Sequence, residues 1–199
     1  MFLSGLDKAD LKLRQTVIAN NGAHGLYVST CRLVFDKSMI DSWLVRGHDH
    51  QITGSNSLLT FSDFTVKGGR RCGVRLPGGE LRTSNSTFTG SAAGGSCFKL
   101  KKMVASDSQF TNNSLYGLQL HGSGALDRCT IARNRVAILL QGTDAADTVT
   151  VRGCTLKDNQ EIGIYAVGDT MTFDADTLQG TTIAGSKIVY SGLRSQLTL

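Results

Sequence analysis

The sequence predicts an all-β fold, a parallel β-helix solenoid of about eight coils with three short strands per coil. Three observations predict it. The first is a repeated phrase, clearest from Phe110 to Leu120, in which an apolar residue and a small polar turn precede Gly-apolar-x-apolar. The second is the regular spacing of that phrase. The third is a two-residue alternation of apolar side chains, which is typical of strands and not of helices.

The apolar residue that opens each copy is the anchor of its coil. Successive anchors are 22, 26, 22, 22, 21, 25 and 22 residues apart. A period of this size is typical of stacked-repeat proteins. Leucine-rich solenoids have a similar period, but their Leu-x-x-Leu-x-Leu-x-x-Asn frame is absent here. The anchors are Ile18, Ile40, Val66, Phe88, Phe110, Ile131, Leu156 and Leu178.

Each coil offers three strand-like stretches: a leading apolar pair, the anchor with the residue two before it, and the pair after glycine. Turns such as Asn112-Asn113 separate them, and Gly, Asn and Asp accept the left-handed backbone that a sharp corner needs. The Ile131 coil is one residue short and offers Ala125 and Leu126 as its leading pair. The other leading pairs are Leu11/Leu13, Leu33/Phe35, Leu59/Phe61, Leu81/Thr83, Met103/Ala105, Val149/Val151 and Met171/Phe173. At about 4.8 Å per coil, eight coils would make a rod about 38 Å long.

Composition fits a single domain. The chain has 199 residues, 40% of them hydrophobic, and its 23 glycines and single proline suit short strands joined by tight turns. We expect a short N-terminal cap or linker at 1–10, one β-helix domain at 11–190 and a C-terminal tail or cap at 191–199. Few residues remain to cover the end coils. We therefore expect self-association through the open ends, or stacking on the rest of a larger parent protein.

Several classes of partner and compartment can be assessed from charge and from the N-terminus. A net charge of +5 without a run of like charges predicts no nucleic-acid binding. The N-terminal Met-Phe-Leu-Ser-Gly-Leu-Asp-Lys lacks a long apolar stretch, so we expect no signal peptide and no membrane span. The sequence does not identify the compartment. An extracellular location as part of a larger protein is one of the alternatives. Five cysteines without regular spacing predict no disulfide framework, and no cofactor is expected.

The Asn-Asn or Asn-Gly turns and the Gly-apolar-x-apolar phrase resemble those of the right-handed parallel β-helix family of pectin-lyase-like proteins, including the short parallel β-helix repeat modules. The resemblance covers about residues 11–190 and implies a right-handed solenoid. It implies no single activity, because the fold hosts polysaccharide lyases, pectin hydrolases, uronan epimerases, phage tailspikes and non-catalytic modules. In the lyases and epimerases the active groove lies on an exposed sheet. The Asp-Pro-His motif of mannuronan epimerases is absent from this sequence, as is an outward Asp cluster that would hold calcium.

The strand after glycine predicts a binding face. Its middle residues point outward, and a second outward column two residues further on contains Lys101, His121 and Gln141, with Tyr116 at the margin. Cations at coil spacing suit the carboxylates of an extended acidic, uronate-type polysaccharide, and exposed tyrosines can stack on sugar rings. The first column is Tyr27, Asp49, Arg75, Lys99, Gln119, Leu139, Tyr165 and Lys187. The expected substrate-binding residues are Tyr27, Asp49, Arg75, Lys99, Lys101, Gln119, Gln141 and Tyr165.

Whether this face also catalyses is left open by the sequence. Lyase or epimerase chemistry needs a cation to neutralise the carboxylate, together with a base and an acid. Lys99 or Arg75 would neutralise, and His121 and Tyr116 would exchange the proton. The alternative is a solvated polar face on a non-catalytic structural or interaction module of a larger surface, tailspike or adhesin-type protein.

His48-Asp49-His50 interrupts the apolar pattern of the second coil. Two His at alternate strand positions share a face and would suit a metal ion. The register supplies no third ligand, so we expect these residues to line a loop and we expect no metal site.

Two recurrent inward positions are interpreted as structural. Cys129 and Cys154 stand where other coils have Ser86 and Ser108, which predicts a column of small interior residues. At another corner an amide recurs, which predicts stacked and hydrogen-bonded side chains. Its members are Asn113, Asn134 and Asn159.

Overall fold

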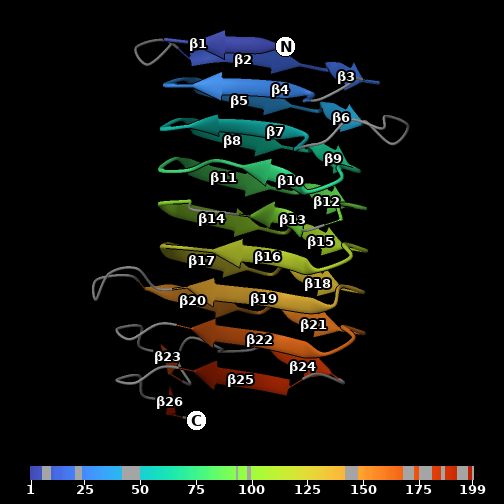
Figure 1. Ribbon diagram of the computed structural model, residues 1–199, viewed down its shortest axis with the longest axis vertical. Coiled ribbons are helices and arrows are strands. Elements are labelled where there is room, and N and C mark those ends of the chain that lie inside the picture. The colour runs from blue at the N-terminus through green and yellow to red at the C-terminus, as the bar shows by residue number, and fades with distance from the viewer. Residues whose placement is uncertain are drawn as a thin grey trace.

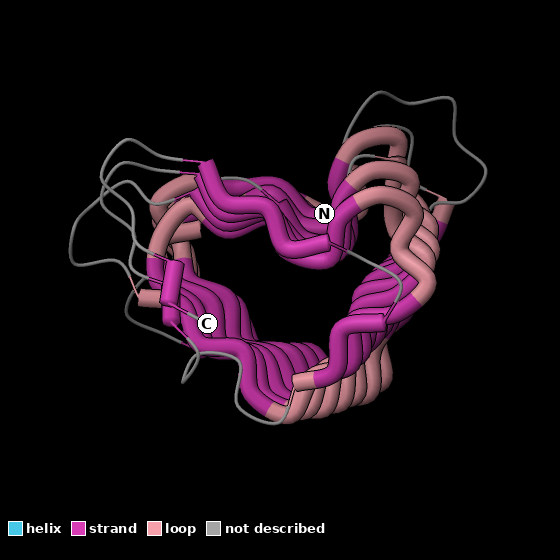
Figure 2. The backbone as a smooth tube through the Cα atoms, turned by 90° about the horizontal axis from the view of Figure 1, so that it is seen from below, coloured by secondary structure: helices cyan, strands magenta, loops and turns pink. Residues whose placement is uncertain are grey.

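The computed structural model describes residues 1–5, 10–20, 24–41, 50–92, 94–97, 100–141, 148–167, 173–174, 181–184, 187–191 and 197–198. Within these residues the chain forms strands and no helix. Three long parallel sheets run side by side along a rod. The chain passes through them in turn from one end of the rod, marked N, to the other, marked C (Figure 1). Seen along the rod, the strands superpose into three walls around a common interior (Figure 2). The predicted all-β parallel solenoid is confirmed.

Sheet A holds the strands that follow the glycine of each repeat. These strands vary more in length than those of the other two long sheets. In spatial order they are β1 (Phe2–Ser4), β4 (Leu26–Ser29), β7 (Ile52–Ser55), β10 (Cys72–Arg75), β13 (Gly94–Cys97), β16 (Tyr116–Leu120), β19 (Val136–Gln141), β22 (Ile162–Val167) and β25 (Lys187–Ser191).

Sheet B holds the leading pairs. Its strands are β2 (Asp10–Arg14), β5 (Arg32–Asp36), β8 (Leu58–Ser62), β11 (Glu80–Ser84), β14 (Lys102–Ser106), β17 (Ser123–Asp127) and β20 (Val149–Arg152).

Sheet C holds the anchors. Its strands are β3 (Val17–Ala19), β6 (Met39–Asp41), β9 (Thr65–Lys67), β12 (Thr87–Thr89), β15 (Gln109–Thr111), β18 (Thr130–Ala132), β21 (Thr155–Lys157) and β24 (Thr182–Ala184). A small separate pair is formed by β23 (Phe173–Asp174) and β26 (Leu197–Thr198). The three long sheets contain nine, seven and eight described strands, so their counts differ. The estimate of about eight coils is therefore slightly off.

The core is made of stacked identical positions. Phe88 pairs in register with Val66 on one side and Phe110 on the other, and all three side chains are fully buried. The rings of Phe88 and Phe110 stack with their centroids 4.8 Å apart. Burying one large apolar side chain per strand contributes roughly 1.5–3 kcal/mol for each. The predicted anchors and leading pairs thus form the interior.

Three predicted positions are wrong. Phe173, which was expected in a leading pair, lies on β23 and pairs with β26 instead of joining sheet B, and its expected companion Met171 lies outside the described residues. In sheet C the partner of Leu156 is Ile183, and the expected anchor Leu178 lies outside the described residues. On β17, Ala125 pairs with Val104 and faces outward, while Gly124 takes the inward place opposite Met103. Gly124 is required there because an added Cβ would lie 2.7 Å from Cδ1 of Leu120.

The corner between sheets B and C repeats one local device. A residue with positive φ, such as Asn85 or Asp107, turns the chain, and in most coils the next residue is a small Ser or Cys, with Phe64 after Asp63 as an exception. The backbone N–H of Ser86 donates to Oγ of Ser108 one coil away at 3.2 Å, and that of Cys129 donates to Sγ of Cys154 at 3.3 Å. The predicted small-residue column is confirmed. Among the described cysteines Cys31, Cys129 and Cys154 are free, and Cys72 is disulfide-bonded.

The corner between sheets C and A contains the predicted amide stack. Asn134 accepts from both the backbone and the side-chain nitrogen of Asn113, at 3.0 and 3.1 Å, and in turn donates to Asn159. All three are buried. The stack satisfies backbone groups that a corner would otherwise leave unpaired.

No helix of the described residues is long and apolar enough to span a membrane.

Candidate functional site

The first outward column of sheet A has one residue per strand, and the register identifies it. Tyr27 pairs with Thr53, Thr53 with Arg75, and Arg75 with Cys97. Further along, Gln119 pairs with Leu139, which pairs with Tyr165. The structure therefore lines up Tyr27, Arg75, Gln119 and Tyr165 as the sequence predicts.

Three other members of the predicted column are replaced. Thr53, Cys97 and Val189 stand where Asp49, Lys99 and Lys187 were expected. Asp49 and Lys99 lie outside the described residues. For Asp49 the error has a physical cause: the extra residues of the second coil precede its sheet A strand, so the nine-residue distance that leads from Ile18 to Tyr27 stops short of Thr53 when it is counted from Ile40.

Gln119, His121 and Gln141 form a hydrogen-bonded row at the end of β16 and β19. The Nε2 atom of Gln119 lies 3.0 Å from Nε2 of His121 and donates to Oε1 of Gln141 at 2.9 Å. Since an amide nitrogen only donates, Nε2 of His121 is the acceptor and the ring proton sits on Nδ1. Gln119 is 4% exposed, whereas His121 and Gln141 remain partly exposed.

The side-chain oxygen of Gln119 lacks the hydrogen bond that a buried polar atom normally has. This Oε1 atom is buried and has no hydrogen-bond partner among the described residues. Leaving a buried acceptor unsatisfied costs about 1–3 kcal/mol. The amide nitrogen of Gln119 thus holds the side chain in place through its two donated hydrogen bonds, while the side-chain oxygen is buried without a partner among the described residues.

Tyr116 does not join this row. It opens β16, five residues before His121, so the two lie about 16 Å apart along an extended strand. Arg75 ends β10 and is partly exposed, and exposed Lys101 lies at the corner that leads into sheet B, its N–H bonded to the carbonyl of Gly79. The structure brings His121 and the glutamines together and keeps Tyr116 apart.

Tyr27 belongs to an aromatic pair at the N-terminal edge of sheet A. Its ring stacks on that of Phe2, with centroids 4.9 Å apart and planes 5° from parallel. Phe2 is 69% exposed. Sequence analysis placed Phe2 only in the N-terminal cap, although its position in register with Tyr27 makes it part of the outer face.

His50 is buried beside sheet A, and its Nδ1 accepts the backbone N–H of Cys72 at 3.1 Å. Its ring stacks on His24, whose Nδ1 faces the carbonyl of His50 at 3.2 Å. Both Nδ1 atoms are therefore engaged with backbone groups. The described residues contain no group of three or more His, Cys, Asp or Glu that would hold a metal ion. His48 and Asp49 lie outside them.

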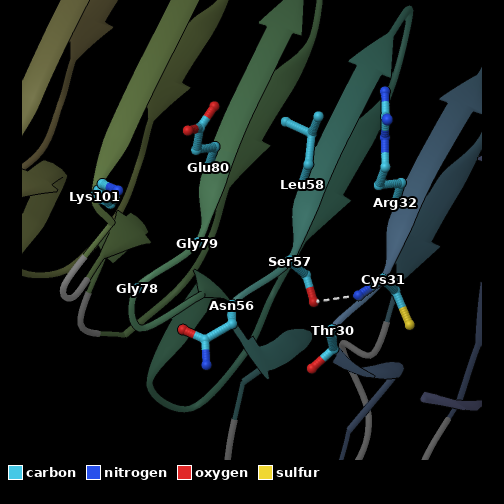
Figure 3. A pocket seen from close by; sticks show the side chains of 10 residues that line it. All are labelled: Thr30, Cys31, Arg32, Asn56, Ser57, Leu58, Gly78, Gly79, Glu80 and Lys101. Atoms are coloured by element: carbon cyan, nitrogen blue, oxygen red, sulfur yellow. Dashed lines mark hydrogen bonds between the residues drawn. The ribbon is translucent and has the colours of Figure 1, made fainter. Parts of the chain in front are cut away.

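Two surface hollows of about 450 Å³ each lie along the corner between sheets A and B. Both are lined by Glu80 and Lys101, and together the two neighbouring hollows are called the corner groove. Figure 3 shows its first part, where the side chains of Arg32, Leu58 and Glu80 stand in a row above the glycines of the fourth coil. Sequence analysis missed this groove because it considered only sheet A. The remaining residues that line it are Thr30, Cys31, Asn56, Ser57, Gly78, Gly79, Lys102, Val104, Ser123, Gly124, Ala125, Thr148 and Thr150.

The shifted pKa values of Asp107, Arg128 and Cys129 arise from contacts that hold the solenoid together. Arg128 binds both carboxylate oxygens of Asp107 one coil away, at 2.8 and 2.9 Å, which lowers the pKa of Asp107 and raises that of Arg128. The contact with Cys154, together with burial, raises the pKa of the Cys129 thiol. A thiol of raised pKa inside the core is a poor nucleophile.

Fold and surface together define a solenoid of stacked parallel strands with a polar, grooved exterior. The family model described as right handed beta helix region matches residues 51–198. The chain belongs to this family, and the predicted resemblance is confirmed.

Among solved structures, the chain is similar to the A-module of the mannuronan C-5 epimerase AlgE4 from Azotobacter vinelandii. The likeness has 13% sequence identity and a TM-score of 0.39, and it covers 98% of this chain and 80% of that one. No curated protein matches the sequence. At this identity and TM-score we draw no conclusion about function from the epimerase.

Proposed function

We propose that this protein is a carbohydrate-directed β-helix protein that binds an acidic, uronate-type polysaccharide along the outer face of sheet A. The observation that carries the proposal is the fixed row of Gln119, His121 and Gln141. A few convergent polar groups held in place by their own hydrogen bonds are typical of ligand sites.

The chemistry of the row suits a sugar. His121 and Gln141 are partly exposed, and Gln119 holds both of them in place from a buried position. A sugar hydroxyl is both donor and acceptor and matches such groups. Arg75 and Lys101 supply positive charge on the same side of the rod, where they favour an anionic ligand over a neutral one.

The geometry favours binding over turnover. Tyr116 and His121 stand at opposite ends of a strand about 16 Å apart, too far to act on one sugar carbon as acid and base. The Nε2 atom of His121 is already occupied by the amide of Gln119. In the column the neighbour of Arg75 is Cys97, which is not a cation.

The test is calorimetric titration with alginate and polygalacturonate oligomers, with neutral dextran as control. We expect both uronates to bind, dextran to fail, and Gln119→Ala to weaken uronate binding about tenfold, because both neighbours lose their anchor. Ultraviolet absorbance of unsaturated products and proton NMR of the sugar should show no turnover. Absence of uronate binding would refute the proposal, and product formation would replace binding by catalysis.

A second candidate, a structural module that associates through its end, has one observation in its favour. At the N-terminal end of the rod, Met1, Phe2 and Val17 are 49%, 69% and 63% exposed. Strands β1, β2 and β3 each lie at the edge of a sheet, where unpaired backbone groups can bind another chain. Light scattering across a concentration series should then show a species larger than the monomer, and Val17→Lys should reduce it. A monomer at every concentration would exclude association through this end.

A further inference from the structure

The corner groove is hollow for a reason that is visible in the sequence. At the corner between sheets A and B, two earlier coils carry side chains at Thr30-Cys31 and Asn56-Ser57, but the fourth coil carries Gly78-Gly79. A Cβ at Gly79 would lie 2.6 Å from the carbonyl oxygen of Ser57, and one at Gly78 would lie 2.5 Å from Oδ1 of Asn56. The backbone therefore approaches its neighbour closely, and no side chain fills the corner.

The lining is apolar along its floor. Leu58, Val104 and Ala125 face outward on sheet B, where solvated strands normally present polar residues. Val104 is one of four large apolar residues counted as exposed in the described part of the chain. Val104 and Ala125 are neighbours in register, and this apolar pair suits the C–H faces of sugar rings.

The rim is polar and positively charged. Arg32, Lys101 and Lys102 are exposed, and neither lysine forms an ion pair with the described residues. The carboxylate of Glu80 is paired with Arg82 at 3.8 Å. Ser123, Thr148 and Thr150 add hydroxyl groups. The uncompensated charge along the groove is therefore that of Lys101 and Lys102, which favours an anion.

The groove is long enough for an oligomer. It runs from Arg32 on β5 to Thr150 on β20, five strand steps along sheet B. At about 4.8 Å per step this is about 24 Å. Side chains repeat once per coil in register, and an extended glycan repeats on a similar scale.

We propose that the corner groove is a second binding site for the same anionic polysaccharide, which crosses from the polar row on sheet A over the corner onto sheet B. Carboxylates of the glycan pair with Lys101 and Lys102, and its sugar faces pack on Val104 and Ala125. This inference rests on the proposed function, because it extends the path of the ligand beyond sheet A.

The test measures binding of a long polygalacturonate to four variants. Lys102→Gln removes charge and Val104→Ser removes the apolar floor, and neither residue belongs to the row on sheet A. Lys157→Gln removes an exposed lysine on sheet C and is the matched control. Gln119→Ala reports on sheet A. We expect each groove variant to weaken binding about threefold to tenfold, and Lys157→Gln to leave it unchanged.

The outcomes separate the two proposals. If Gln119→Ala weakens binding while Lys102→Gln and Val104→Ser do not, the ligand stays on sheet A and the groove inference is overturned. If the wild-type protein does not bind polygalacturonate or alginate, the proposed function fails and the inference with it. Melting curves of all variants control for folding, and the exposed position of both groove residues predicts unchanged melting temperatures.

Discussion

Asn134 accepts two hydrogen bonds from Asn113, one from its backbone nitrogen and one from its side chain, across a corner between neighbouring coils. Asn134→Ala removes that acceptor, leaves the buried N–H of Asn113 without this partner, and takes away the hydrogen bond from Nδ2 of Asn134 to the carbonyl of Phe110. We expect a loss of about 2–4 kcal/mol in the free energy of unfolding, measured by urea titration. Ser114→Ala, at an exposed position of the same corner, is the control and should change little. A loss below about 0.5 kcal/mol for Asn134→Ala would show that water replaces the amide.

Thr83 offers a stabilising change. Its side chain is buried in sheet B between Phe61 and Ala105, and its Oγ1 atom has no hydrogen-bond partner among the described residues. Thr83→Val keeps the shape and removes a desolvated hydroxyl, so we expect a gain of about 1 kcal/mol. Thr60→Val, at a partly exposed outward position, should give no such gain. Equal effects at both sites would mean that the hydroxyl of Thr83 is satisfied after all.

Two glycines predict opposite responses. At Gly117 a Cβ would lie 2.6 Å from Cγ2 of Ile131 and 2.7 Å from the carbonyl oxygen of Ala137, so Gly117→Ala should destabilise by about 1–3 kcal/mol. Gly153 has φ 56° and no atom closer than 3.5 Å to an added Cβ, and other coils place Asn85 or Asp107 at this corner with similar φ. Gly153→Asn should therefore be neutral or stabilise by up to about 1 kcal/mol. The melting temperatures of both variants test this prediction. It is wrong if Gly153→Asn melts at a lower temperature than Gly117→Ala.

The pair Asp107 and Arg128 predicts an acid-sensitive contribution to stability. Because Arg128 lowers the pKa of Asp107 in the folded state, the carboxylate stabilises the fold above its unfolded pKa of about 3.9. That contribution disappears as the pH falls through the lower folded pKa. We expect the melting temperature of Asp107→Asn to lie below that of the wild type at neutral pH and to converge with it below about pH 3.

Asp158→Asn is the control, since it removes an exposed carboxylate that forms no ion pair among the described residues. Its melting temperature should stay parallel to that of the wild type over the same range. If the two Asp variants depend on pH in the same way, the bidentate contact contributes nothing specific.

Most of the fold was predictable because the interior of a solenoid is a repeated environment. Phe88 and Phe110 stack at equal positions, so the period of apolar residues alone locates them. The anchor of the last coil was predicted wrongly, although the sequence contains a repeat that identifies it. The tripeptide Thr182-Ile183-Ala184 repeats Thr130-Ile131-Ala132 letter for letter and marks the true anchor, whereas the spacing pointed to Leu178.

The candidate site was predicted only where a coil keeps its standard length. Gln119, His121 and Gln141 were correctly assigned to neighbouring outward positions, since two residues along a strand or one coil along the rod bring side chains together. The corner groove was not predicted. It arises from missing side chains at Gly78 and Gly79, and no pattern of apolar residues reports on an empty volume.

The register has a consequence for how such a chain can diversify. Ile40 and Val66 pair across 26 residues, and Phe88 and Phe110 pair across 22, yet the same ladder runs through both. Extra residues enter at a corner and leave the next strand in its place. A corner can therefore gain, lose or exchange whole segments while the rod beneath it keeps its dimensions, so recognition and scaffold are free to evolve separately.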